Sequence, residues 1–485
     1  MSPILVFSII AGYFALLMLI AKLTSKGSDS ESFFTGNKQS PWYLVAFGMI
    51  GASLSGVTFI SVPGEVGNSN WSYFQVVLGY LVGYFVVATV LLPLYYKLNL
   101  VSIYQYLETR FGVKSYKTGA FFFLISRVIG ASFRLFLVAG VLQIALFDAF
   151  DIPFGVSVLV TIALIWLYTF QGGIKTIVWT DTLQTFFMLL AVVLSIYFVA
   201  SDLDLGWSGL MTVIEDSPLS TTFVWDWQSP QNFFKQFIAG AFIAIVMTGL
   251  DQDMMQKNLT CRNLKDAQKN VFWFSTSLIF VNLFFLALGV LLYHYAEVNG
   301  IVMPNRSDNL YPLLALNEFH LVGGIAFLLG ITAAAYSSAD SALTALTTSF
   351  YVDFLNKDPK ESNNKTRMTI HLGFSILIFF VILAFRAIND DSVIVAVFKV
   401  AGYTYGPLLG LYSFGLFNER KIKDNLAPIV CLLSPLLTYL LNINSEWLLG
   451  GYKFGFELLL VNGLFTFIGL WVISQAQQRD PKSVA

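Results

Sequence analysis

The chain of 485 residues carries little charge: 28 Lys and Arg against 29 Asp and Glu, for a formal net charge of -1. Charged residues make up 12% of the chain and hydrophobic residues 56%. Soluble domains are about 25% charged, so this composition excludes a soluble enzyme, a nucleic-acid binder and a disordered scaffold. It indicates an integral membrane protein.

Cysteine and histidine are too sparse for two further classes of protein. The two cysteines, Cys261 and Cys431, cannot form a disulfide framework or a multi-cysteine metal site. The three histidines are spread along the chain, which argues against a histidine-rich metal centre.

Apolar windows of about 20 residues, the length that crosses about 30 Å of hydrocarbon, recur along the whole chain. They predict an all-α polytopic membrane protein with about thirteen transmembrane helices. The predicted spans are 3–21, 41–62, 73–97, 118–147, 153–170, 176–200, 232–251, 271–296, 321–347, 368–387, 393–417, 426–443 and 455–475. The first span lacks a preceding basic residue and a clear cleavage site, so we expect a retained helix rather than a signal peptide.

Lys and Arg are distributed unevenly over the loops between these spans. One alternate set of loops holds most of them, whereas the opposite set holds only Arg306, Arg386 and Lys453. Cytoplasmic loops are enriched in Lys and Arg, so the N-terminus is expected outside and the C-terminus in the cytoplasm. No loop is long enough for an ordinary folded domain, and residues 1–485 are expected to form a single transmembrane domain.

Two predicted spans concentrate small polar residues. Span 41–62 contains Gly48, Gly51, Ser53, Ser55, Gly56, Thr58 and Ser61; span 321–347 contains Ser337, Ser338, Asp340, Ser341 and Thr344. In the first span, free carbonyls facing a cation and small-residue helix packing explain the pattern equally well. In the second, adjacent hydroxyls and the Ala334 carbonyl offer hard oxygen ligands for an alkali cation. We favour an ion site there over a solvated cavity or a helix–helix hydrogen bond.

Three further charged residues within the spans are candidates for a functional role. Asp181 is either an acid favoured by the helix dipole or a cation ligand from another helix. Arg127 and Arg134 lie seven residues apart and share a face. Arg127 is expected to snorkel to the cytoplasmic interface, whereas Arg134, about two turns deeper, suits a carboxylate of a substrate or of the protein.

Five motifs, in order along the chain, resemble the sodium/solute symporters, which carry proline, sugars, iodide, monocarboxylates, vitamins and sialic acid. They are SFFTGNKQSPWYLVAFGMIGASLSGVTFISVPG, VSIYQYLETRFG, GGIKTIVWTDTLQ, GLDQDMMQKNLTCRNLKDAQK and AAAYSSADSALTALTTSF. The resemblance implies a five-plus-five inverted repeat over 41–200 and 232–417. It also implies broken first and sixth core helices, with peripheral helices at 3–21 and 426–475.

The resemblance further implies where sodium binds. The main site is expected to use Gly51, Leu54, Ala334, Ser337 and Ser338. A second cation site is expected to use Asp181, Ser337, Asp340 and Ser341, so one or two sodium ions would bind per cycle. Asp340 stands where a hydroxyl is more usual, which would either strengthen cation binding or replace sodium by a proton.

The residues implied for substrate binding point away from a neutral hexose. They are Ser53, Ser55, Thr58, Arg134, Ala244 and Met247. Sugar carriers have an amide and a tyrosine where Ala244 and Met247 stand, whereas acid carriers are similar to this chain in having hydroxyls and an arginine.

The resemblance therefore implies a sodium-coupled symporter, not an enzyme, that imports a small organic anion across the bacterial inner membrane by alternating access. The alternatives are a neutral-solute symporter and a membrane sensor. We also expect contact with membrane lipid and no nucleic-acid partner, and we expect a monomer to be sufficient for transport.

Overall fold

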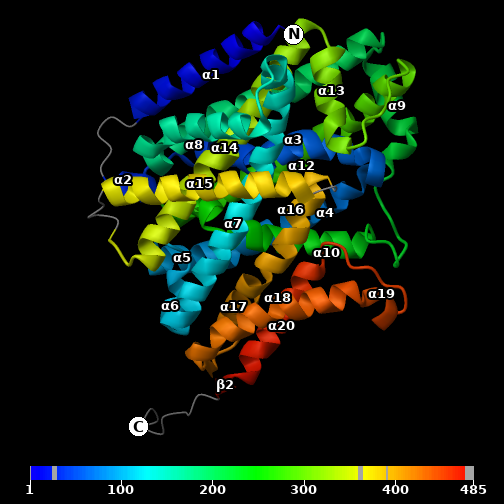
Figure 1. Cartoon of the computed structure of the whole chain (residues 1–485). Helices are drawn as coiled ribbons and strands as arrows, with labels where there is room; N and C mark the ends of the chain where they lie inside the picture. Colours follow the sequence, from blue (N-terminus) through cyan, green and yellow to red (C-terminus); the bar gives the residue numbers. More distant parts are fainter. Residues whose placement is uncertain (1, 25–29, 359–363, 389–391, 476–485) are drawn as a thin grey trace, which may run out of the picture.

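The computed structural model describes residues 2–24, 30–358, 364–388 and 392–475, and these residues are mostly helical (Figure 1). The helices are α1 (Pro3–Thr24), α2 (Ser30–Thr35), α3 (Trp42–Ser69), α4 (Tyr73–Val86), α5 (Leu92–Leu98), α6 (Gln105–Arg110), α7 (Val113–Leu142), α8 (Phe154–Asp202), α9 (Trp207–Asp216), α10 (Phe233–Ala244), α11 (Gln252–Asn258), α12 (Leu264–Val298), α13 (Leu310–Asn317), α14 (Leu321–Ser349), α15 (Asn364–Ile388), α16 (Val393–Thr404), α17 (Gly406–Phe417), α18 (Ala427–Ile443), α19 (Ser445–Leu448) and α20 (Leu458–Val472). Within this described part, the only strands are the short antiparallel pair β1 (Lys421–Ile422) and β2 (Ser474–Gln475).

Length and apolar composition identify the membrane-crossing helices. Among the described residues, eight helices qualify, or up to ten if each of two bent helix pairs counts as one span. Two shorter apolar helices, Phe154–Leu167 and Leu458–Val472, accompany them. The thirteen predicted spans coincide with helices, but the structure joins 41–62 and 73–97 into the single stretch Trp42–Leu98. The protein is therefore a multi-pass membrane protein, and thirteen crossings remain a prediction.

The predicted spans 153–170 and 176–200 lie on one helix, α8, which is interrupted at Gly173. Gly173 has φ 54° and ψ -152°, a conformation that residues with a Cβ adopt only with strain. A Cβ at this position would lie 2.4 Å from the ring of Phe33. Glycine is therefore required where α8 changes direction.

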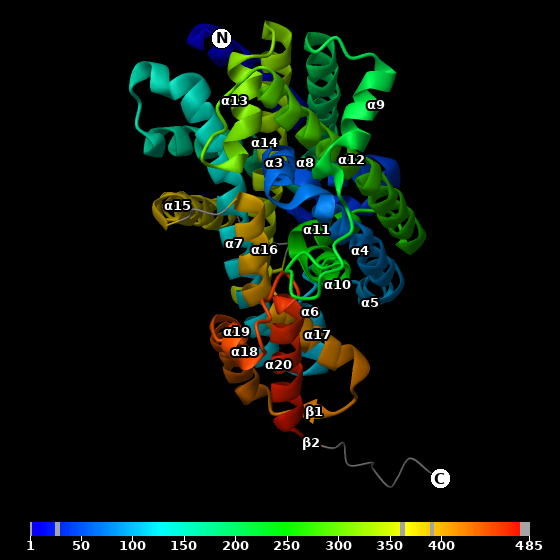
Figure 2. The ribbon, with the colours of Figure 1, turned by 90° about the vertical axis from the view of Figure 1, so that its right-hand side faces the viewer.

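The centre of the molecule is α14, which packs against α8, α3 and α7 (Figure 2). Every residue of α14 from Gly330 to Ser349 is buried, and many of them are Ala, Ser or Thr. Small side chains let helices approach closely in a membrane, where packing rather than the hydrophobic effect holds them together. The polar groups of α14 are thus enclosed by other helices.

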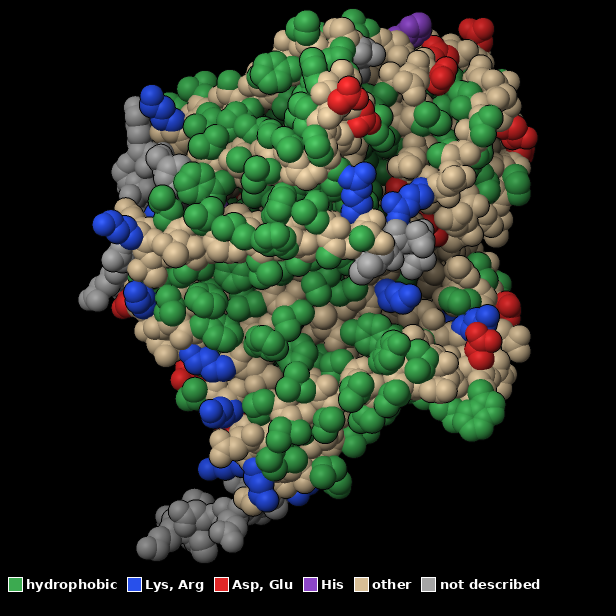
Figure 3. Space-filling model, viewed as in Figure 1, with side chains coloured by type: hydrophobic (Ala, Val, Ile, Leu, Met, Phe, Trp, Pro, Cys, Tyr) green, Lys and Arg blue, Asp and Glu red, His purple; other side chains and the backbone are tan. Residues whose placement is uncertain are grey.

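The peripheral helices predicted at 3–21 and 426–475 lie at opposite ends of the molecule, with α1 at one end and α18 and α20 at the other (Figures 1 and 2). Apolar side chains are spread over the whole visible face; Lys and Arg line its left and lower-left edges, and a further group of them lies in its right half (Figure 3). Large exposed apolar surfaces are typical of proteins whose solvent is lipid.

Candidate functional site

Two interruptions of regular helix lie close to a central cavity. In α3, Ser55 has φ 51° and ψ 176°, which is not helical. Gly51 and Leu54, whose carbonyls are predicted sodium ligands, precede this interruption in the chain. The second interruption follows α10, where a π-helical turn over Ile245–Gly249 leads into α11 at a bend of 70°.

The cavity measures about 70 Å³ and is lined by α3, α4, α7, α10, α11, α12 and α16 together with the π-helical turn. It brings together all six predicted substrate residues: Ser53, Ser55, Thr58, Arg134, Ala244 and Met247. Because these residues come from three separate parts of the chain, folding alone explains their proximity. The cavity is the candidate substrate site.

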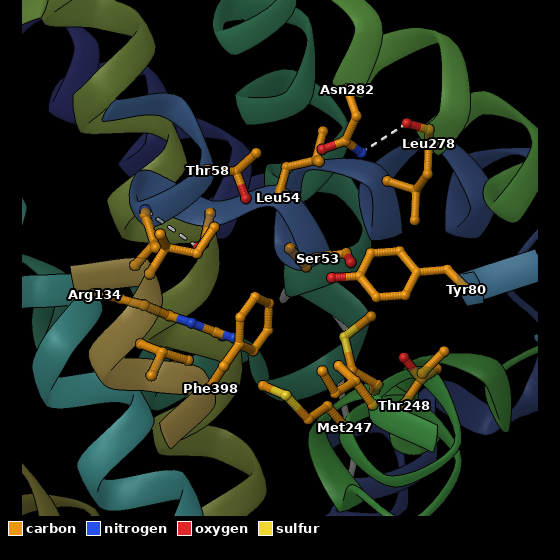
Figure 4. Close-up of a pocket in the computed structure, with 18 of the residues that line it drawn as sticks. Ser53, Leu54, Thr58, Tyr80, Arg134, Met247, Thr248, Leu278, Asn282 and Phe398 are labelled. Carbon is orange, nitrogen blue, oxygen red and sulfur yellow. Dashed lines mark hydrogen bonds between the residues drawn. The ribbon is translucent and has the colours of Figure 1, made fainter. Parts of the chain in front are cut away.

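Arg134 supplies positive charge at this cavity. Its side chain is 8% exposed and extends toward Phe398 (Figure 4). Within the described part of the chain, no hydrogen bond or ion pair to Arg134 is present. A planar guanidinium in a buried cavity is suited to bind a carboxylate through two parallel hydrogen bonds.

The cavity also contains polar groups that the sequence analysis did not identify. The Tyr80 hydroxyl points toward that of Ser53 (Figure 4) and lies 3.1 Å from the Tyr73 hydroxyl. The side-chain nitrogen of Asn282 donates to the Leu278 carbonyl at 2.7 Å, and among the described residues its buried side-chain oxygen has no hydrogen-bond partner. The sequence could have indicated Asn282 as a polar residue of the site, because it is the single side-chain amide inside the apolar span 271–296.

The residues predicted for the main sodium site lie on helices that pack together, α3 and α14. The Ser338 hydroxyl donates to the Ala334 carbonyl at 3.1 Å, and the Gly51 amide donates to the Thr185 hydroxyl at 3.1 Å. Ser337 and Ser338 are fully buried. The hydroxyls and the carbonyl that α14 offers to a cation are thus enclosed by the neighbouring helices.

Of the residues predicted for the second cation site, the structure joins Asp181 and Ser337 directly. The Ser337 hydroxyl donates to one Asp181 carboxylate oxygen at 2.7 Å, and the Nζ of Lys257 lies 2.7 Å from the other. Asp340 and Ser341 are buried on the same helix as Ser337. Lys257 was not predicted as a site residue, because it lies between the spans 232–251 and 271–296 in a loop expected to face the cytoplasm.

The expectation that Arg127 snorkels to the interface was wrong. Its side chain is 4% exposed and forms an ion pair with Asp253, while one of its nitrogens lies 3.8 Å from a carboxylate oxygen of Asp251. The Tyr405 hydroxyl also donates to Asp251, at 2.5 Å. Asp251 and Asp253, at and just beyond the end of the predicted span 232–251, were the signal in the sequence for a buried partner of Arg127.

A helical membrane protein with buried hydroxyls, ion pairs and a central polar cavity has the features of a solute carrier. The family model "Sodium:solute symporter family" matches residues 33–424, and the chain belongs to this family. The family consists of sodium-coupled transporters, so the protein is a sodium-coupled symporter and not an enzyme.

Two curated relatives and one solved structure are similar to the chain over most of its length. The sodium/sialic acid symporter SiaT of Proteus mirabilis is 26% identical over 85% of this chain and 85% of its own. The sodium/sialic acid symporter NanT of Aliivibrio fischeri is 25% identical over 81% of this chain and 78% of its own. A solved outward-open, substrate-bound Na⁺-coupled sialic acid symporter has a TM-score of 0.81 at 20% identity, covering 97% of this chain and 98% of that one. This likeness establishes the symporter fold.

Proposed function

We propose that the protein imports a small organic anion, such as a carboxylate or an acidic sugar, together with sodium. The observation that carries this proposal is Arg134, a buried guanidinium beside a polar cavity with no acid paired to it among the described residues. An unpaired buried charge is costly, so a substrate carboxylate would stabilise it. The two similar symporters named for sialic acid, an acidic sugar, support the same chemistry.

Sodium is proposed to bind at the interruption of α3, between the carbonyls of Gly51 and Leu54 and the α14 groups of Ala334, Ser337 and Ser338. The second site is proposed at Asp181, with Ser337, Asp340 and Ser341. The interruptions at Ser55 and after α10 support the proposal that the first and sixth core helices of an inverted repeat are broken. One or two sodium ions would then accompany each substrate.

The proposed location is the bacterial inner membrane, with the N-terminus outside and the C-terminus in the cytoplasm. The edges of the molecule that are rich in Lys and Arg support this orientation (Figure 3). We also propose that a monomer embedded in the lipid bilayer is sufficient for transport.

The test is uptake into proteoliposomes with and without an inward sodium gradient. The panel should contain monocarboxylates and sialic acid, with a neutral sugar, a polyol and proline as the uncharged or zwitterionic comparison. We expect sodium-stimulated uptake of at least one anion and none of the neutral sugar. Uptake of a neutral solute alone would favour the alternative symporter, and absence of any sodium-stimulated uptake would favour a sensor.

Substitution of Arg134 shows whether this residue recognises the charge. Arg134→Lys should weaken apparent substrate affinity at least tenfold, because Lys keeps the charge but loses the bidentate geometry. Arg134→Gln should abolish recognition while sodium binding remains measurable. The matched control is Arg386→Gln, because Arg386 is exposed and lies over the ring of Phe154, far along α15. Arg127→Gln is unsuitable as a control, since it would leave Asp253 without its ion-pair partner.

A further inference from the structure

The strongest unassigned feature is the ion pair between Lys257 and Asp181. The side chains of Lys257 and Asp181 are 2% and 1% exposed, and the ammonium nitrogen lies 2.7 Å from a carboxylate oxygen. Lys257 is in the last turn of α11, whereas Asp181 lies within α8. A lysine seldom enters the interior of a membrane protein without a partner that compensates its charge.

The helix that carries Lys257 contacts the proposed second site at two points. Asp253 and Lys257 are four residues apart and therefore share one face of α11. On the facing helix α14, Ser337 and Ser341 are also four residues apart. Ser341 donates to Asp253 at 3.4 Å, and Ser337 donates to Asp181, which binds Lys257.

These contacts use both carboxylate oxygens of Asp181, one for the Ser337 hydroxyl and one for the Lys257 ammonium. The ammonium therefore supplies the single positive charge that a bound sodium ion would otherwise provide. A cation attached to the chain has a high effective concentration at its partner, whereas a free ion must come from solution. A second cation beside the ammonium would also be repelled by it at close range in a medium of low dielectric constant.

We infer that Lys257 is a tethered cation that competes with a second sodium ion for Asp181. While the ion pair is closed, the carrier binds one sodium ion, at the carbonyls and hydroxyls of α3 and α14. This inference rests on the proposed function, because it presumes that the main sodium site is real. The inference goes beyond the proposed function because it names Lys257 as the group that sets the number of bound sodium ions.

The test is a measurement of sodium binding to the purified full-length carrier, with radioactive sodium as the probe and choline as the inert cation. The wild type should bind one sodium ion per chain. Lys257→Gln releases Asp181 and should bind two, whereas Lys257→Arg keeps a tethered cation and should bind one. The binding curve of Lys257→Gln should accordingly become cooperative or biphasic.

A second variant covers the case in which Lys257→Gln fails to fold because it leaves a buried carboxylate unpaired. Lys257→Gln combined with Asp181→Asn removes both charges together, and it should bind one sodium ion. Two ions on the wild type that fall to one on this double variant would overturn the inference, because Asp181 would then hold sodium despite Lys257. Equal stoichiometry in the wild type and Lys257→Gln would also overturn it. A wild type that binds no sodium would refute the proposed function itself, and the inference with it.

Discussion

At the scale of single residues, the two adjacent serines of α14 face different partners. The Ser337 hydroxyl donates to Asp181 on another helix, whereas the Ser338 hydroxyl donates back to the Ala334 carbonyl of its own helix. Both hydroxyls keep lone pairs that can coordinate a cation. Their burial means that any such cation would be largely removed from water.

Replacing both serines tests whether they bind sodium. We expect Ser337→Ala combined with Ser338→Ala to raise the sodium concentration needed for half-maximal transport at least tenfold, which corresponds to ~1.4 kcal/mol. The measurement is substrate uptake against sodium concentration. Ser375→Ala is the matched control, because Ser375 is buried on α15 and donates to the carbonyl four residues earlier, as Ser338 does. Unchanged sodium dependence in the double variant would show that the site lies elsewhere.

Asp340 distinguishes a sodium ligand from a proton carrier. It is fully buried on the same helix, where a carboxylate needs a compensating positive charge or a proton. Asp340→Ser should therefore change either the Hill coefficient for sodium or the pH dependence of transport. Both are measured on the same reconstituted carrier over a range of sodium concentrations and pH values. If activity persists and neither quantity changes, Asp340 has a structural role only.

At the scale of elements, the interruption of α3 depends on an unfavourable backbone conformation. Ser55 has φ 51° and ψ 176°, a combination that is essentially restricted to glycine and costs a residue with a Cβ about 1–3 kcal/mol. The Ser55 hydroxyl accepts a hydrogen bond from the Val57 amide at 3.3 Å, which offsets part of this cost. The interruption lies next to Gly51 and Leu54, so strain and the proposed sodium site occur together.

Two substitutions at this position should act in opposite directions. Ser55→Gly relieves the strain and should raise the melting temperature of the purified carrier, whereas Ser55→Val should lower it and weaken sodium binding. Thermal unfolding with and without sodium measures both effects. Ser61→Gly is the control in the regular part of α3, where glycine should destabilise by about 0.5–1 kcal/mol. A Ser55→Gly variant as unstable as Ser61→Gly would contradict this account of the interruption.

At the scale of the whole molecule, the uneven distribution of Lys and Arg over the loops predicts which side of the membrane each loop occupies. Both native cysteines are fully buried, and burial together with Asp266 raises the pKa of the Cys261 thiol to about 12. A thiol with so high a pKa is almost entirely protonated near neutral pH and reacts slowly. Cysteines introduced at the surface can therefore be labelled over a low background.

Labelling in whole cells tests the proposed orientation. A membrane-impermeant maleimide should modify Gln228→Cys, which lies in the loop between α9 and α10, without permeabilisation. Lys423→Cys, which lies between α17 and α18, should react only after the cells are permeabilised. The reverse pattern would show that the chain is inserted with the opposite orientation.

The sequence by itself determined the membrane class, the mostly helical fold and the family. These follow from local properties: apolar length, the scarcity of charge and the order of short motifs. It also placed hydroxyls on α3 and α14 and an arginine at 134, because polar residues stand out within apolar spans.

Only the tertiary structure decided which charged groups meet. Lys257 lies in a stretch that resembles a basic cytoplasmic loop, yet the bend after α10 directs α11 inward, so that the lysine reaches Asp181. The same bend brings Asp253 to Arg127, which the pattern of the sequence assigned to the interface. Pairing between residues far apart in the chain depends on helix direction and packing, and no local spacing encodes it. In the described part of the molecule, this packing leaves Arg134 facing the cavity while it pairs Arg127 within the protein.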